Sequence, residues 1–145
     1  MRTMLRNGFL FALIVLLGSF STNLLAQTQQ MNKEEFLKKV FNYETSKEWK
    51  YLGDKPAILN FYASWCGPCR MIAPFLDQLA EEYKDQIHIY KINTDQEREL
   101  FGAFGGGGIP LLIFVPMEGQ PQANRGALPK EEIKRAIDAI LLGKK

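Results

Sequence analysis

The chain has 145 residues, of which 18 are Lys or Arg and 16 are Asp or Glu, so its formal net charge is +2. This length allows one ordinary domain, and the small charge argues against the strongly basic face of a nucleic-acid-binding protein. Two cysteines and one histidine are too few for a structural zinc site or for a miniprotein held by several disulfides. We therefore expect a single globular domain with no nucleic-acid partner, no metal and no cofactor.

Residues 1–26 differ in composition from the rest of the chain. Two arginines precede an apolar run over residues 9–17, and the segment ends at the small residue Ala26. This pattern is typical of a secretory signal peptide, so we predict cleavage that leaves a domain of residues 27–145, exported across the inner membrane to the periplasm. The alternative, a retained N-terminal membrane anchor, would need an apolar run of about 20 residues. Because the two arginines are the surplus positive charges, the cleaved domain would be neutral.

The first half of that domain predicts a helix and then a strand. Asn32 and Glu35 have the spacing of a capping box, and the apolar residues that follow recur at helical spacing over about three turns. Trp49 and Tyr51 alternate with polar residues, which allows a short strand. Residues 57–63 are nearly all apolar, as expected of a central strand that is covered on both faces.

A long helix and a second central strand come next. Residues 67–83 carry apolar positions at the 3.6-residue period over four turns, and Pro74 within them predicts a kink because the periodicity continues past it. Residues 87–92 predict the second central strand. Thr94 and Glu97 predict another capping box, which would open a short helix.

The last third begins with four consecutive glycines at residues 105–108. A strand is predicted over residues 111–115, and a turn then leads into an edge strand over residues 120–124. Pro129 suits the first position of a final helix. The order predicts an α/β domain, in which a β-α-β unit has parallel strands and the closing hairpin adds antiparallel ones.

Both cysteines fall between the first central strand and the longest helix. At a helix N-terminus the unpaired N–H groups and the helix dipole favour a thiolate, so we expect the pKa of Cys66 to be lowered. Cys69 lies one turn further on, where it should be more shielded yet able to attack a mixed disulfide on Cys66. Pro68 stiffens the turn. Thiol-disulfide exchange needs this combination of an exposed attacking thiol and a shielded resolving thiol.

The cysteine pair could also serve a structural role or bind a metal. A purely structural disulfide across two intervening residues would close a very short loop and contribute little loop entropy. Half of a metal site would need further ligands, and His88, the only histidine of the chain, lies in a predicted strand. The residues therefore favour redox catalysis.

The sequence around the cysteines resembles the thioredoxin family. Residues 60–74 are similar to the active-site block of the family, including the proline inside the helix. Residues 91–95 resemble its third strand and the following turn, Ile109-Pro110 its cis-proline segment, and Gly126-Ala127 the adjoining glycine turn. The resemblance covers roughly residues 48–142. It implies a thioredoxin fold, with a central mixed sheet of four to five strands flanked by helices.

The resemblance also implies roles for individual residues. Cys66 would be the nucleophile that attacks a protein disulfide, and Cys69 the cysteine that resolves the mixed disulfide. The backbone before a cis Pro110 would pair with the substrate chain as an added strand. The substrate groove would consist of Trp65, Ile109, Pro110 and Gly126, and the residues that support the active site would be Trp65, Gly67, Pro68, Asn60, Lys91 and Pro110.

Asn60 departs from the family pattern. The family usually has a buried aspartate six residues before the first cysteine, where it acts with a nearby lysine in proton transfer at the second cysteine. An asparagine can form hydrogen bonds but cannot accept a proton near neutral pH. We therefore expect slower deprotonation of Cys69, with Lys91 or water taking a larger part. The alternative is that Asn60 is simply a buried polar residue satisfied by backbone or water.

The glycine run is the second departure. The family commonly places a β-branched residue and a charged residue before Ile-Pro, whereas residues 106–108 offer no side chains. Because glycine is costly to order, we expect this loop to be looser and the groove to be wider or less selective.

The favoured function is that of a secreted thioredoxin that reduces disulfide-containing proteins in the cell envelope, and the resemblance suggests a monomer. The Cys66-Gly67-Pro68-Cys69 motif resembles the reducing end of the family. An oxidising compartment cannot keep such a pair reduced, so a membrane-embedded electron donor is implied. The alternatives are a disulfide oxidase or isomerase that uses the same pair, and a redox-inert binding module with the same fold.

Overall fold

The computed structural model of the chain describes residues 28–144, and the predicted signal peptide over residues 1–26 lies outside them. None of the helices within this described part is long and apolar enough to cross a membrane. The elements in chain order are β1 (Gln29–Gln30), α1 (Lys33–Lys39), β2 (Ala57–Tyr62), α2 (Gly67–Glu82), β3 (His88–Asn93), α3 (Arg98–Ala103), β4 (Leu111–Val115), β5 (Gln122–Arg125), α4 (Lys130–Ala136) and the π-helix η1 (Ile137–Leu141).

The strands form one mixed sheet in the order β1-β3-β2-β4-β5. β2 pairs in parallel with β3 and antiparallel with β4, and β5 continues the sheet antiparallel to β4. Asn60 in the middle of β2 lies opposite Lys91 of β3 and Leu112 of β4. This arrangement confirms the predicted β-α-β unit and the antiparallel hairpin.

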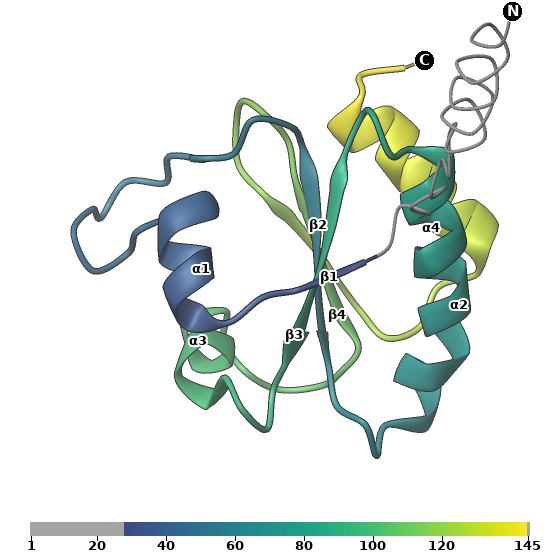
Figure 1. The fold of residues 1–145 in the computed structure, drawn as a ribbon, viewed down its shortest axis with the longest axis horizontal. Coiled ribbons are helices and arrows are strands. Elements are labelled where there is room, and N and C mark those ends of the chain that lie inside the picture. Colours follow the sequence, from purple (N-terminus) through teal and green to yellow (C-terminus); the bar gives the residue numbers. More distant parts are fainter. Residues whose placement is uncertain (1–27, 145) are drawn as a thin grey trace, which may run out of the picture.

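Helices cover both faces of the sheet, with α1 and α3 on one side and α2 and α4 on the other (Figure 1). Alternate side chains of β2 pack on the two faces of the sheet. Leu59 and Phe61 are fully buried in the core that contains residues of α1 and α3, and Ile58 is fully buried in the core beneath α2 and α4. The continuous apolar run of β2 is therefore explained by two apolar cores, as the sequence predicted.

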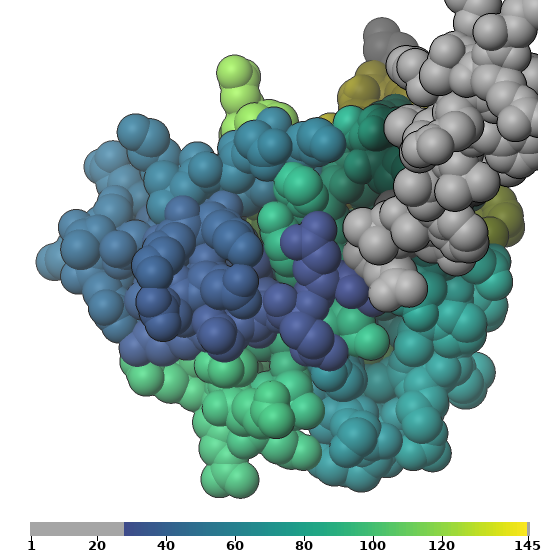
Figure 2. Space-filling model, viewed as in Figure 1, coloured from purple at the N-terminus to yellow at the C-terminus, as the bar shows by residue number. Residues whose placement is uncertain are grey.

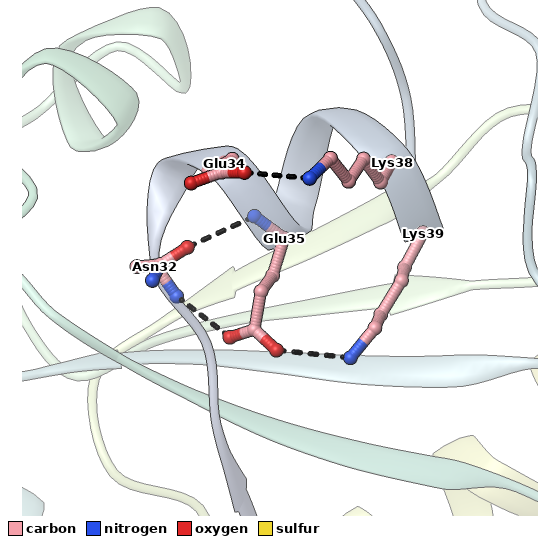
Figure 3. Close-up of polar contacts among 5 residues, drawn as sticks. All are labelled: Asn32, Glu34, Glu35, Lys38 and Lys39. Carbon is pink, nitrogen blue, oxygen red and sulfur yellow. Dashed lines mark hydrogen bonds and ion pairs between the residues drawn. The ribbon is translucent and has the colours of Figure 1, made fainter.

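The predicted capping box at the start of α1 is confirmed (Figure 3). The Asn32 side chain accepts a hydrogen bond from the Glu35 N–H at 2.9 Å, and the Glu35 carboxylate accepts one from the Asn32 N–H at 3.4 Å. Lys38 and Lys39 pair with Glu34 and Glu35 one turn back, at 2.5 and 3.0 Å. The helix has 7 residues, about two turns rather than the three expected, because its backbone leaves the helical pattern at Val40.

The short strand suggested by Trp49 and Tyr51 does not form. The segment of residues 41–56 contains turns and irregular backbone instead. The Trp49 ring packs on Phe41 with 4.8 Å between ring centroids, and the Tyr51 hydroxyl donates to the Lys55 carbonyl at 2.6 Å. The alternation of Trp49 and Tyr51 with polar residues therefore does not indicate a strand. It reflects two aromatic side chains that cover the α1 side of the core.

The capping box predicted at Thr94 and Glu97 is wrong. Glu97 is itself the N-cap residue of α3, without a side-chain cap, and its carboxylate accepts a hydrogen bond from the Lys33 N–H at 3.1 Å. The Thr94 hydroxyl donates instead to the Tyr62 carbonyl at 3.3 Å. α1 and α3 lie side by side on the surface (Figure 2). Lys33 at the start of α1 also pairs with Glu99 of α3. The Glu97 carboxylate thus connects α3 to the start of α1 instead of capping α3.

Replacing Asn32 by Ala should lower the free energy of unfolding by about 1 kcal/mol, because the first turn of α1 loses its side-chain acceptor. Chemical denaturation of the variant and the wild type measures the difference. Asn32→Asp is the matched control, since an aspartate keeps the acceptor. Equal stability of Asn32→Ala and wild type would show that the capping box contributes nothing.

Candidate functional site

The end of β2 and the start of α2 place the two cysteines together. Cys66 is the N-cap residue of α2 and forms a disulfide with Cys69, with 5.3 Å between their Cα atoms. The Cys69 N–H donates a hydrogen bond to the Cys66 Sγ at 3.2 Å. Pro68 occupies the first turn, and α2 continues past Pro74, as the periodicity predicted. The helix start therefore directs a backbone N–H at the first sulfur.

The two cysteines are almost equally buried in this disulfide form. Cys66 is 5% exposed and Cys69 is 3% exposed, so the expected contrast between an exposed and a shielded cysteine is absent here. Cys66 is covered because the loop before β4 crosses it: the Ile109 carbonyl oxygen lies 3.8 Å from the Cys66 Sγ. Ile109 also packs against the small buried cluster of Ala63 and the two cysteines. The loop before β4 therefore contributes to the burial of Cys66.

The loop that covers Cys66 contains the expected cis-proline. The Ile109-Pro110 peptide bond is cis, which confirms the prediction from the resemblance. Gly126, which has a φ of 94°, donates its N–H to the Pro110 carbonyl at 2.8 Å. Three of the predicted groove residues are therefore brought to one place from two separate segments of the chain.

Trp65, the fourth predicted groove residue, lies beside the cysteines with its side chain open to solvent. It is 67% exposed, and its indole N–H donates to the Asp95 carboxylate at 2.9 Å. The Asp95 N–H in turn donates to the Asn93 side chain at 2.9 Å. Sequence reasoning missed Asp95 as a site residue. Its position just after β3, at the same sheet end as the cysteines, was the available signal.

Asn60 is buried on the same side of the sheet as the cysteines. Alternation along β2 places it on one face with Ile58, which lies beneath α2, and with Tyr62, which packs against the buried cluster that contains the cysteines. Asn60 is 2% exposed, and its Oδ1 has no hydrogen-bond partner within the described residues. Lys91 lies opposite it in register, but the Lys91 ammonium group is 5.2 Å from the centroid of the Tyr62 ring.

The glycine run adopts backbone conformations that suit glycine. Gly105, Gly106 and Gly107 have positive φ values of 85°, 54° and 89°. The Arg125 guanidinium on β5 donates to the carbonyl oxygens of Gly106 at 2.5 Å and Gly108 at 3.3 Å. A side chain from another strand therefore binds the loop that we expected to be looser. The local sequence could not reveal this contact.

His88 takes no part in this site. Its Nε2 lies 2.8 Å from the Asp54 carboxylate, at the opposite end of β3 from the residues that follow Asn93. Across residues 28–144, no three His, Cys, Asp or Glu side chains are grouped in a way that could hold a metal ion.

Comparison with known proteins gives one consistent result. The thioredoxin family model matches residues 27–139. The thioredoxin of Borreliella burgdorferi is 39% identical over 107 residues, which cover 74% of this chain and 92% of that protein. Thioredoxin 1 of Synechococcus elongatus is 36% identical over 86 residues, which cover 59% and 80%. The crystal structure of chloroplastic thioredoxin z covers 79% of this chain and 94% of its own, with a TM-score of 0.67 and 24% identity, so it supports the fold alone.

Asn60→Asp should accelerate the resolution of a mixed disulfide by Cys69. Burial would raise the pKa of the new carboxyl group, which could then accept a proton from the Cys69 thiol near neutral pH. Rapid-quench measurement of resolution across the pH range tests this expectation, with Asn60→Ser as a control that lacks a carboxylate. An unchanged rate and pH profile in Asn60→Asp would refute it.

The same variant should show a pH-dependent loss of stability. Its folded-state pKa would lie above the unfolded value of about 3.9. Stability relative to wild type should therefore be retained below about pH 4 and fall as the pH rises through the folded-state pKa. Denaturation midpoints at several pH values measure this trend, and a midpoint difference that is constant with pH would contradict it.

Proposed function

The chain belongs to the thioredoxin family, whose model it matches over residues 27–139, and from this premise we propose that it reduces protein disulfides in the cell envelope. Family membership and the cysteine pair make it a disulfide oxidoreductase. The observation that carries the proposal is the Cys66-Cys69 disulfide at the N-terminus of α2, beside the cis Pro110.

In the first step, the Cys66 thiolate attacks one sulfur of a substrate disulfide. The substrate S–S bond breaks, a mixed disulfide forms, and the departing substrate thiolate takes a proton. The Cys69 N–H, which donates to the Cys66 Sγ, would also stabilise the thiolate before attack. The positive end of the α2 dipole acts in the same direction.

In the second step, the Cys69 thiolate attacks the Cys66 Sγ of the mixed disulfide. The Cys66-Cys69 disulfide re-forms, and the second substrate thiolate leaves and is protonated. Two electrons and two protons have then passed from the protein dithiol to the substrate. Asn60 cannot take the proton of Cys69 as a carboxylate would, and the Lys91 ammonium group has donors but no acceptor, so that proton passes to water.

The substrate chain would lie against Ile109 and Pro110. Ile109 packs on the cysteines, and the backbone before Pro110 is placed to pair with an extended substrate segment as an added strand. The exposed Trp65 provides apolar surface on this part of the molecule, and Met71 on α2 is 66% exposed as well. Main-chain pairing would give affinity for many sequences, as a general reductase requires.

The proposed location in the envelope rests on residues 1–26, whose composition is that of a signal peptide. Each turnover leaves Cys66 and Cys69 oxidised, so a donor of two electrons must restore the dithiol. In an oxidising compartment we assign this role to a membrane-embedded thiol donor. The chloroplastic M-type thioredoxin of Pisum sativum is 38% identical to this chain over 88 residues, so the family serves more than one compartment.

Cys66→Ser should abolish the reduction of insulin disulfides by dithiothreitol-recycled protein, because no nucleophile remains. Cys69→Ser should still attack and should accumulate a mixed disulfide that mass spectrometry detects. The turbidity assay on wild type and both variants separates an enzyme from a redox-inert binding module. Activity of Cys66→Ser equal to that of wild type would contradict the assignment.

A further inference from the structure

Arg125 is the last residue of β5, and its side chain contacts the glycine loop that precedes β4. In the β4-β5 ladder it is opposite Leu111, the residue directly after Pro110. The next residue, Gly126, donates its N–H to the Pro110 carbonyl at 2.8 Å. The Arg125 side chain is exposed. Its backbone is therefore fixed beside the cis-proline, while its side chain remains accessible.

The guanidinium group is held by the loop before β4, which is the loop that covers Cys66. It donates to the carbonyl oxygens of Phe104 at 3.3 Å, Gly106 at 2.5 Å and Gly108 at 3.3 Å. Gly108 directly precedes Ile109, whose carbonyl oxygen lies 3.8 Å from the Cys66 Sγ. The positive charge is thus positioned one residue away from the backbone that contacts the attacking sulfur.

The glycines matter here for their backbone conformation. A Cβ atom on Gly107 would lie 3.4 Å from the Arg125 Nη1, and one on Gly105 would lie 3.6 Å from the Nη2, which are ordinary van der Waals contacts, so space alone does not require glycine. Both residues have positive φ values, which side-chain-bearing residues rarely adopt. The glycines therefore give the loop the backbone conformation in which its carbonyl oxygens accept hydrogen bonds from the guanidinium group of β5.

The charge of Arg125 is not neutralised by the protein. Its hydrogen-bond partners are three neutral carbonyl groups, and it forms no ion pair with another residue of the described chain, in contrast to Arg135, which pairs with Glu132. A guanidinium group has five N–H donors, so donors remain after these bonds. A free cation with open donors suits a carboxylate, which binds guanidinium through charge-assisted hydrogen bonds.

We propose that Arg125 is a specificity-determining residue, which favours substrate segments that carry Asp or Glu next to the disulfide. The proposal rests on the proposed function, since it requires a substrate chain that lies along Ile109 and Pro110. Such a chain passes the guanidinium group, and an acidic side chain near its cysteine can reach it. The Arg125 guanidinium then makes the groove selective by charge, where the sequence alone indicated a less selective groove.

The test uses two peptides that each contain one intramolecular disulfide and differ only by Glu or Gln beside a cysteine. The rate constant for their reduction by the dithiol form of the protein is followed by stopped-flow fluorescence. Wild type should reduce the Glu peptide about threefold to fivefold faster at low salt, the upper part of the range for an exposed ion pair. High salt should bring this ratio close to one.

Variants separate the charge from the contacts with the loop. Arg125→Met should bring the Glu-to-Gln ratio to about one, and Arg125→Lys should retain a ratio above one because the charge remains. Arg135→Met, which removes an exposed charge on α4, is the matched control and should keep the wild-type ratio.

Equal rates for the two peptides with wild type would overturn the proposal while leaving the reductase function intact. A ratio that persists in Arg125→Met would also overturn it, even if both rates fall, because Arg125 would then only position the loop. If wild type reduced neither peptide nor insulin, the proposed function itself would fail, and this proposal with it.

Discussion

The burial of β2 on both faces is the constraint on which the rest of the structure depends. Leu59 and Phe61 enter the core on the α1 side and Ile58 the core on the α2 side, so neither face of the strand is open to a substrate. Reactive groups can therefore appear only where the strand ends, as is general for open α/β sheets. Cys66 lies at that end, and the immediate start of α2 directs the Cys69 N–H at its sulfur.

The antiparallel half of the sheet supplies the other side of the site. β4 pairs with β2, which brings Ile109 and Pro110 over the cysteines, and β5 pairs with β4, which brings Arg125 and Gly126 beside Pro110. The cysteines thus come from the β2-α2 connection, whereas the surface that we propose meets the substrate comes from the start of β4 and the end of β5. This division allows substrate preference to change without altering the cysteines.

Features that depend on neighbouring residues in the sequence were predictable, and features that depend on distant partners were not. The capping box of Asn32 could be predicted because both of its hydrogen bonds lie within four residues. Glu97 had the same spacing from Thr94, yet its carboxylate binds the backbone of α1 instead. The two-residue strand β1 has no periodicity to detect. The contact of Arg125 with the glycine loop depends on strand pairing, so it emerged only from the structure.

The central claim is that Cys66 and Cys69 act as a reductant, and their reduction potential tests it most directly. The protein would be equilibrated with glutathione or a reference dithiol of known potential, and the fraction of the disulfide determined by thiol alkylation. The account predicts a reduction potential of about −270 mV, as in reducing members of the family. A reduction potential of about −120 mV, that of a strong oxidant, would contradict the account and make the protein a disulfide donor.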